Sequence, residues 1–178
     1  MREMGSIEVK RVTAADVKAL QEIGRQTFFE TFSGENTEDD MQKYLNEGFA
    51  LEKLKKELNC PSSEFYFAQD EGVPVGYLKL NYGISQTEIQ DREALEIERI
   101  YVVKEYHGKK VGQLLYEKAI QVGLALGASY VWLGVWEKNL RAISFYRKNG
   151  FVEFDKHIFR LGNDEQTDIM MKRRLKSE

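Results

Sequence analysis

The stretch LEIERIYVVKEYHGKKVGQLL, from Leu95 to Leu115, joins an apolar strand to a helix through a basic turn that contains a glycine at each end. Apolar and charged residues alternate in its first half, which is typical of a β-strand. Val111, Leu114 and Leu115 then recur at helical spacing. Backbone N–H groups at a helix start have no intrahelical acceptor, and the helix dipole is positive there. The stretch therefore predicts a strand, a turn and a helix arranged to approach an anion.

The turn itself, HGKKVGQ at residues 107–113, leaves two interpretations open. Gly108 and Gly112 allow close approach of the backbone, and Lys109 and Lys110 add positive charge. The turn is not a P-loop, because no Gly-Lys-Ser/Thr follows a first glycine, and it does not match the dinucleotide fingerprint. From these residues alone, it is either a phosphate site or an exposed basic turn.

Periodicity and turn signals predict an α/β (α+β) fold for the whole chain. Strand–helix–strand units in the second half favour parallel pairing there, and hairpins favour antiparallel pairing elsewhere. A length of 178 residues suits one domain, residues 1–178. The expected strands are residues 7–13, two strands within 64–82, then 95–103, 130–136, 151–154 and 168–174. The expected helices begin after Thr13, after Thr37, at about Leu51, at Val111 and after Asn139.

Composition narrows the function classes. A formal net charge of −3 argues against nucleic acid as a partner. The single cysteine, Cys60, excludes an intramolecular disulfide, and no run approaches the ~20 apolar residues that span a membrane. His107 and His157 lie far apart in sequence, so no metal site is expected. We therefore expect a cytoplasmic protein without a metal and without a membrane segment.

Two segments resemble motifs of the GCN5-related N-acetyltransferases (GNAT). That family has Gln/Arg-x-x-Gly-x-Gly/Ala after a strand; here the positions read His107-x-x-Lys110-Val111-Gly112, with departures at His107 and Lys110. WEKNLRAISFYRKNGFVEF is similar to the family's Asn-x-x-Ala-x-x-Phe-Tyr-x-Lys-x-Gly-Phe. Its matching residues are Asn139, Ala142, Phe145, Tyr146, Lys148, Gly150 and Phe151. The chain most resembles the bacterial PaiA-type spermidine/spermine N-acetyltransferases.

The resemblance implies a strongly twisted, mixed sheet of about seven strands flanked by helices. It implies transfer of the acetyl group of acetyl-CoA to a primary amine, by direct attack in a ternary complex, with a small polyamine-like acceptor. It also implies that a homodimer is a common assembly. The residues that it assigns to the coenzyme are Ile100, Tyr101, Val102, His107, Gly108, Lys109, Lys110, Val111, Gly112, Gln113, Asn139, Ala142, Phe145, Tyr146 and Lys148.

Two residues are candidates for catalysis. The resemblance puts the Tyr146 hydroxyl near the coenzyme sulfur, where it would protonate the departing thiolate; the alternative is a core aromatic. Glu98 is the candidate base for the amine. Strict alternation puts Glu96 and Glu98 on one face with Ile100, and puts Arg99 on the other face, unless a β-bulge disturbs this phase. Glu98 is therefore either a base with a perturbed pKa or one half of an ion pair with Arg99 or a lysine.

The acceptor is less well defined by the sequence. The resemblance and the strand pattern point to six residues: Phe28, Phe29, Thr31, Phe32, Glu35 and Trp136. An acidic, aromatic site would suit a polyamine. A protein lysine or an N-terminal amine is the nearest alternative acceptor. A regulatory module that binds coenzyme A without turnover is the alternative from another class.

Overall fold

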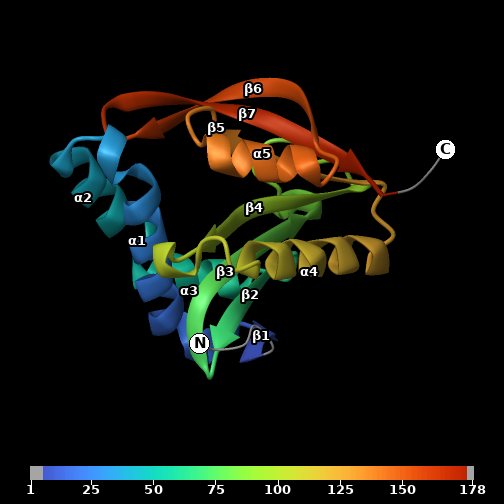
Figure 1. The fold of residues 1–178 in the computed structure, drawn as a ribbon, viewed down its shortest axis with the longest axis horizontal. Coiled ribbons are helices and arrows are strands. Elements are labelled where there is room, and N and C mark those ends of the chain that lie inside the picture. The colour runs from blue at the N-terminus through green and yellow to red at the C-terminus, as the bar shows by residue number, and fades with distance from the viewer. Residues whose placement is uncertain (1–5, 176–178) are drawn as a thin grey trace.

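In residues 6–175, which the computed structural model describes, seven strands form one mixed sheet in the order β1-β2-β3-β4-β5-β7-β6. Only β4 and β5 pair in parallel among these strands (Figure 1). The strands are β1 Ile7–Arg11, β2 Ser63–Asp70, β3 Val73–Tyr82, β4 Ala94–Val102, β5 Tyr130–Trp136, β6 Val152–Leu161 and β7 Asp164–Arg174. The helices are α1 Val17–Phe32, α2 Glu38–Gly48, α3 Leu51–Asn59, α4 Val111–Ala125 and α5 Leu140–Lys148. This is the predicted α+β arrangement.

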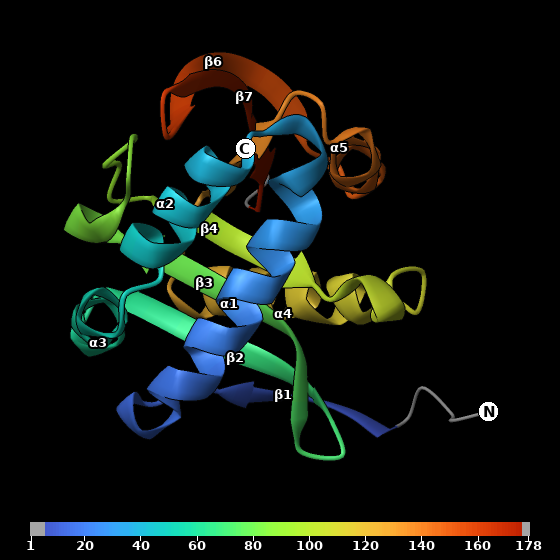
Figure 2. The ribbon, with the colours of Figure 1, turned by 90° about the vertical axis from the view of Figure 1, so that its left-hand side faces the viewer.

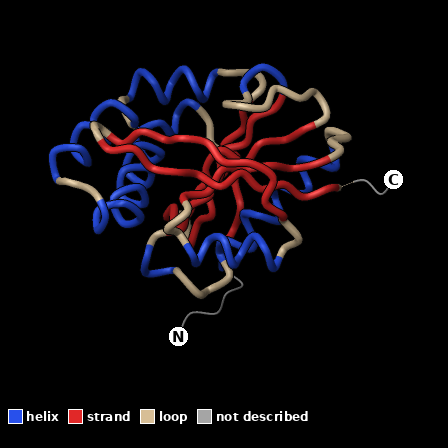
Figure 3. The backbone as a smooth tube through the Cα atoms, turned by 90° about the horizontal axis from the view of Figure 1, so that it is seen from above, coloured by secondary structure: helices blue, strands red, loops and turns tan. Residues whose placement is uncertain are grey.

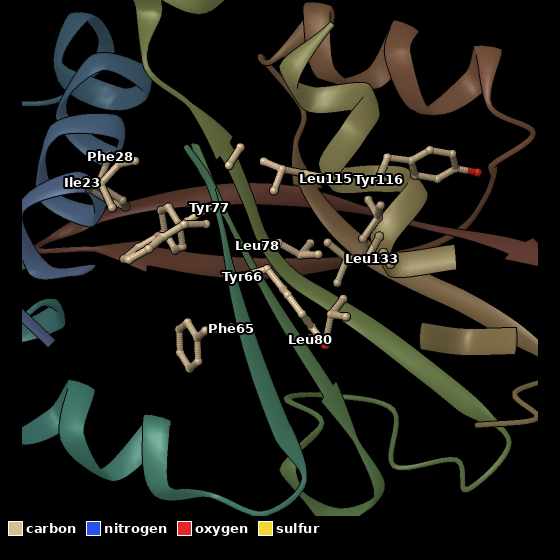
Figure 4. Packing of buried hydrophobic residues seen from close by; sticks show 14 of the residues in the cluster. Ile23, Phe28, Phe65, Tyr66, Tyr77, Leu78, Leu80, Leu115, Tyr116 and Leu133 are labelled. Atoms are coloured by element: carbon tan, nitrogen blue, oxygen red, sulfur yellow. The ribbon is translucent and has the colours of Figure 1, made fainter. Parts of the chain in front are cut away.

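The sheet is twisted, and helices cover both of its faces (Figure 3). Helices α1, α2 and α3 lie over one face (Figure 2). Helix α4 packs on the other face against β2, β3 and β4, and α5 lies beside it, in contact through Tyr116 and Phe145. Phe65 and Tyr77 therefore point toward α1, while Leu78 and Leu80 of the same hairpin point toward α4 (Figure 4).

The capping and turn residues expected from the sequence are found at the starts of the helices and in the hairpin. Thr13 and Asp16 form a capping box before α1, and the Thr37 side chain accepts a hydrogen bond from the Asp40 amide at the start of α2. The β2–β3 hairpin turns on two residues, Glu71 and Gly72, which both have positive φ. A two-residue turn of this kind matches the twist of the paired strands.

The final hairpin extends further than the sequence pattern predicts. β6 runs to Leu161 instead of ending at 154, and β7 begins at Asp164 instead of 168. β6 lies at the edge of the sheet, and the charged residues Asp155, Lys156 and Arg160 along it are exposed, which blunts the edge. Periodic hydrophobicity is absent there, so backbone pairing is the feature that reveals the strand. The extension brings His157 opposite Asp168.

Candidate active site

The sheet divides between β4 and β5. In the described residues, these strands pair only along 94–97 and 130–133. Beyond that point β4 stays with β3, and β5 stays with β7 as far as Trp136 and Asp168, so two unpaired strand edges face each other. A cavity of about 1230 Å³ lies at this opening, with walls from α1, α2, α4, α5 and the sheet. An unpaired edge can accept an extended ligand as an additional strand.

The turn before α4 has the backbone shape that its glycine pattern predicts. Gly108 has φ 78°, and Lys110, at the position of the family's first glycine, has φ 65° and ψ 14°. A left-handed conformation costs a residue with a side chain about 1–2 kcal/mol, so this turn holds Lys110 against its local preference. Lys110 thus adopts the left-handed conformation that a glycine would reach more easily.

The amides at this helix start are available to a ligand. In the described part of the chain, the first α4 bond runs from the Leu114 amide to the Lys110 carbonyl (3.2 Å). The N–H groups of residues 110–113 have no acceptor within residues 6–175, and all four residues line the cavity. A Cβ at Gly112 would meet only Val102 Cγ2, at 3.9 Å, so the backbone there is open. The geometry is that of an anion site at a helix N-terminus.

Two side chains of the turn make contacts that the sequence did not indicate. His107 Nε2 donates to the Val102 carbonyl (2.8 Å) and ties the turn to the end of β4. The Lys109 ammonium lies 4.9 Å from the centre of the Tyr106 ring, and Lys109 does not line the cavity. Lys109 is thus engaged in a cation–π contact on the outer side of the turn.

We call the part of the cavity between the turn at residues 107–113 and helix α5 the coenzyme half. Helix α5 forms its wall opposite the turn. The Asn139 side chain caps the helix by accepting from the Ala142 amide (3.2 Å). Asn139 and the motif residues Ala142, Phe145, Tyr146 and Lys148 all line the cavity. With Ile100, Tyr101 and Val102 on β4, every residue predicted to contact the coenzyme reaches the cavity except Lys109.

Tyr146 lies inside this wall with 6% of its surface exposed. Its ring contacts Phe145 and Phe151, and no described residue forms a hydrogen bond with its hydroxyl. Burial raises the pKa of Tyr146 well above that of a free phenol, so the group is protonated at neutral pH. It can act as a proton donor inside the cavity.

Strict alternation along β4 is wrong beyond Glu98. Lys79 pairs with Arg99 and Leu80 with Ile97, so Glu98 is the extra residue of a β-bulge. A bulge re-aims the side chains next to it. Glu98 and Arg99 consequently lie on the same face, with Glu98 Oε2 3.1 Å from Arg99 Nη2, whereas Ile100 is shifted to the opposite face, across from Leu78.

Glu98 is the centre of a buried polar network. Its Oε1 accepts from Lys79 Nζ and from Asn81 Nδ2, each at 2.8 Å, and Arg99 contacts its other oxygen. Burial would raise the pKa of Glu98, but Arg99 and Lys79 together lower it to about 2. Glu57 Oε1 contacts the same two cations, at 2.6 Å from Lys79 and 3.2 Å from Arg99. Glu98 is thus held as a carboxylate in ion pairs with Lys79 and Arg99. This is the arrangement that the sequence left open as the alternative to a catalytic base.

We call the part of the cavity beside α1 and α2 the acceptor half. Its wall is formed by aromatic side chains. Phe28 stacks on Tyr44 with 4.1 Å between ring centres, and Phe32 lies 4.9 Å from Trp136. Thr31 also lines the cavity, as do all four of these aromatic residues. The Trp136 indole donates to Gln166 (2.7 Å), which fixes the ring against β7.

Two residues predicted for the acceptor lie elsewhere. Phe29 follows the buried Phe28 on α1, so helical geometry turns it outward, where it is 52% exposed. Glu35 pairs with Lys138 at the surface (3.4 Å). Neither residue lines the cavity.

Several cavity residues on the acceptor side were not predicted: Tyr44, Tyr77, Glu88, Glu96, His157 and Asp168. Glu96 lies two residues before Glu98 on β4, and its carboxylate accepts from the Thr87 amide (2.8 Å) and hydroxyl (2.5 Å). Asp168 carried one signal in the sequence, a carboxylate directly before the apolar run at residues 169–171. The others come from separate elements, and only the fold brings them together.

Comparisons with known proteins identify the family. The sequence model of the acetyltransferase (GNAT) family matches residues 21–151. The chain belongs to this family. An uncharacterized N-acetyltransferase in the pepI 3′ region of Lactobacillus delbrueckii subsp. lactis is 39% identical over 172 residues, which is 97% of this chain and 99% of the relative. The chain is thus an acetyl-CoA-dependent N-acetyltransferase, as its motifs predict.

Two further comparisons agree on the subgroup. The spermidine N(1)-acetyltransferase of Thermoplasma acidophilum is 27% identical over 150 residues, 82% of this chain and 88% of the relative. The crystal structure of the PaiA N-acetyltransferase from T. acidophilum in complex with coenzyme A superposes with a TM-score of 0.78 at 25% identity, over 95% of this chain and 99% of that chain. The predicted likeness to PaiA-type enzymes is confirmed.

Within residues 6–175, no cluster of three or more acidic, histidine or cysteine side chains is arranged to hold a metal ion. In the same residues, no helix has the length and apolar character needed to cross a membrane.

Proposed function

We propose that this enzyme acetylates a primary amine of a small polyamine-like cation, such as spermidine or spermine. The observation that supports the proposal most is the acceptor half of the cavity, where aromatic side chains and carboxylates share one face. Glu88, Glu96 and Asp168 are its carboxylates beside the ion-paired Glu98. Aromatic faces and carboxylates both attract alkylammonium groups. The spermidine acetyltransferase among the relatives is consistent with this choice.

The other half of the cavity suits coenzyme A. The free amides of residues 110–113 would hold its diphosphate, with charge added by Lys110 and Lys148. The pantetheine arm would lie along the unpaired edge of β4 from Ile100 to Val102. The Val103 amide donates to Val75 on β3, so the neighbouring Val102 N–H points the other way, into the opening. That N–H could bind the oxygen of the acetyl group during the reaction.

The chemistry divides into proton removal and proton supply. A free alkylammonium has a pKa of about 10, so the amine must lose a proton before it attacks the acetyl carbonyl carbon. The C–N bond forms, the C–S bond breaks, and Tyr146 donates its proton to the sulfur. The acceptor enters from the face of α1 and α2, and the coenzyme enters beside α4 and α5, so the two substrates meet at the β4–β5 opening.

The test is release of coenzyme A thiol from acetyl-CoA with spermidine, spermine and a lysine-containing peptide offered separately. We expect the two polyamines to give a kcat/KM at least about tenfold above that of the peptide. A cavity lined by carboxylates raises the local concentration of a small polycation. Peptide preference would move the assignment to protein acetylation. Coenzyme binding without release in any arm would favour a regulatory module. Light scattering on the same sample would establish whether the chain is the homodimer that its family resemblance implies.

A further inference from the structure

Asp168, which is half-buried, differs from Glu96 and Glu98 of the cavity because its carboxylate has no partner among the described residues. It lies on β7 opposite Trp136, and it lines the cavity where β5 has left β4. No hydrogen bond or ion pair joins its side chain to any residue in the range 6–175. Gly134, its other neighbour on β5, lacks a side chain; a Cβ there would stand 3.5 Å from Asp168 Oδ2. The carboxylate therefore has open space beside it in the cavity.

Glu98, on the same face of the sheet, shows the opposite environment. Two cations and an amide occupy its oxygens and lower its pKa to about 2. Burial acts on Asp168 with little compensation and raises its pKa, while His157 lowers it. Two carboxylates whose pKa values move apart commonly divide the roles of fixed charge and proton acceptor.

Among the described groups around this point of the cavity, Asp168 is the best placed to accept a proton. Tyr44 of α2 and Tyr101 of β4 interact with it electrostatically, and burial raises the pKa of both tyrosines, so both are neutral. β5 presents only Gly134 and Trp136. His157 of β6 lies directly across from Asp168; its Nε2 is 3.3 Å from Glu88, and its Nδ1 is buried without a partner among the described residues.

We propose that Asp168 is the catalytic base that accepts a proton from the acceptor ammonium. This inference rests on the proposed transfer to a primary amine. Asp168 takes one proton from R–NH₃⁺, and the neutral nitrogen attacks the acetyl carbon. Tyr146 gives a proton to the departing sulfur and regains one from the nitrogen as the amide forms. The products are R–NH–COCH₃, the free thiol and one proton, which leaves from Asp168 to solvent.

The experiment compares Asp168→Asn with wild type in kcat/KM for spermidine across a pH series. At neutral pH we expect a loss of about 100-fold, the usual contribution of a general base. The loss should shrink as pH rises toward about 10, where the acceptor supplies its own neutral amine. Asp168→Glu keeps a carboxylate and should retain the acid limb of the profile. His157→Gln should also retain it, which assigns the limb to Asp168.

Asp155→Asn is the matched control, because it removes one exposed carboxylate from the neighbouring strand β6 and should leave the profile unchanged. A thermal melt of Asp168→Asn should be no lower than that of wild type, since the variant buries no unpaired charge. A loss that is equal at every pH, or smaller than about threefold at neutral pH, would overturn the role of Asp168 as base. A wild type that transfers acetyl to no amine would overturn the proposed function, and this inference with it.

Discussion

The two halves of the cavity are built from different materials. The coenzyme half consists mainly of main chain: the amides before α4 and the unpaired edge of β4. The acceptor half consists of side chains from α1, α2, the strands β3 to β7 and the segment between β3 and β4. If main-chain amides bind the coenzyme as proposed, the contrast explains why lysine can stand at the glycine position of the motif. Side chains can vary where N–H groups bind the ligand, provided that the backbone keeps its path.

The acceptor half has the opposite property. Each of its polar groups has its chemistry set by particular neighbours, as Glu98 has by Lys79 and Arg99. Single substitutions there should change protonation, stability or specificity. Substitutions in the turn before α4 should act through backbone conformation, whereas Tyr146 in the α5 wall should act through its hydroxyl group. The following predictions test that division, in order of expected effect.

Glu98→Gln should have the largest effect, and on stability. Removing one partner leaves Lys79 and Arg99 with an uncompensated buried charge, which typically costs about 3–5 kcal/mol. The folded-state pKa of about 2 lies below the ordinary value of 4.5, so wild type has this stabilisation above pH 4.5 and loses it as pH falls toward 2. Urea unfolding at several pH values should show this acid dependence in wild type and a smaller one in the variant.

The same variant separates the two roles considered for Glu98. As an ion-pair residue, Glu98 can be replaced without moving the acid limb of kcat/KM, provided that assays are run well below the melting temperature. Arg11→Gln, which breaks the exposed pair with Glu64, is the control and should cost less than about 1 kcal/mol. A displaced acid limb with normal stability would restore Glu98 as the base and weaken the case for Asp168.

Tyr146→Phe should lower kcat about 100-fold, because the departing thiolate loses its proton donor. The dissociation constant for coenzyme A should change little, since the ring and its contacts remain. Tyr82→Phe, whose hydroxyl bonds to the Pro61 carbonyl away from the cavity, is the matched control. Rapid-quench measurement of the chemical step would distinguish slow transfer from slow product release. An unchanged chemical step in the variant would leave Tyr146 a packing residue.

The sequence predicted the coenzyme half far better than the acceptor half, for a physical reason. A helix start and its turn are local, so residues 107–113 and 139–148 contain most of what is needed to recognise them. The bulge at Glu98 depends on how β3 pairs with β4 across a register shift, which no local pattern records. The approach of His157 to Asp168 depends on the second half of β6, where apolar and polar residues do not alternate.

Lys110 tests the claim that backbone, more than side-chain charge, binds the coenzyme. Lys110→Gly removes the left-handed strain of about 1–2 kcal/mol but adds unfolded-state entropy, so stability should be equal or slightly higher. Coenzyme A affinity should fall by less than about threefold, the size of an exposed charge effect. Lys110→Val should lower both stability and affinity, because a β-branched residue strains this conformation. Calorimetry would measure both. A tenfold loss in the glycine variant would assign the binding to the ammonium group instead.

Glu88→Gln should have the smallest effect, confined to the acceptor. Glu88 is 44% exposed at the rim beside His157, so its attraction for a polycation is screened by water. We expect KM for spermidine to rise about two- to threefold, with kcat and the KM for acetyl-CoA unchanged. High salt should abolish the difference between variant and wild type, because it screens exposed charges. If the KM values for both substrates rose together, the charge of Glu88 would affect both halves of the cavity. The division into a main-chain half and a side-chain half would then not apply to long-range electrostatics.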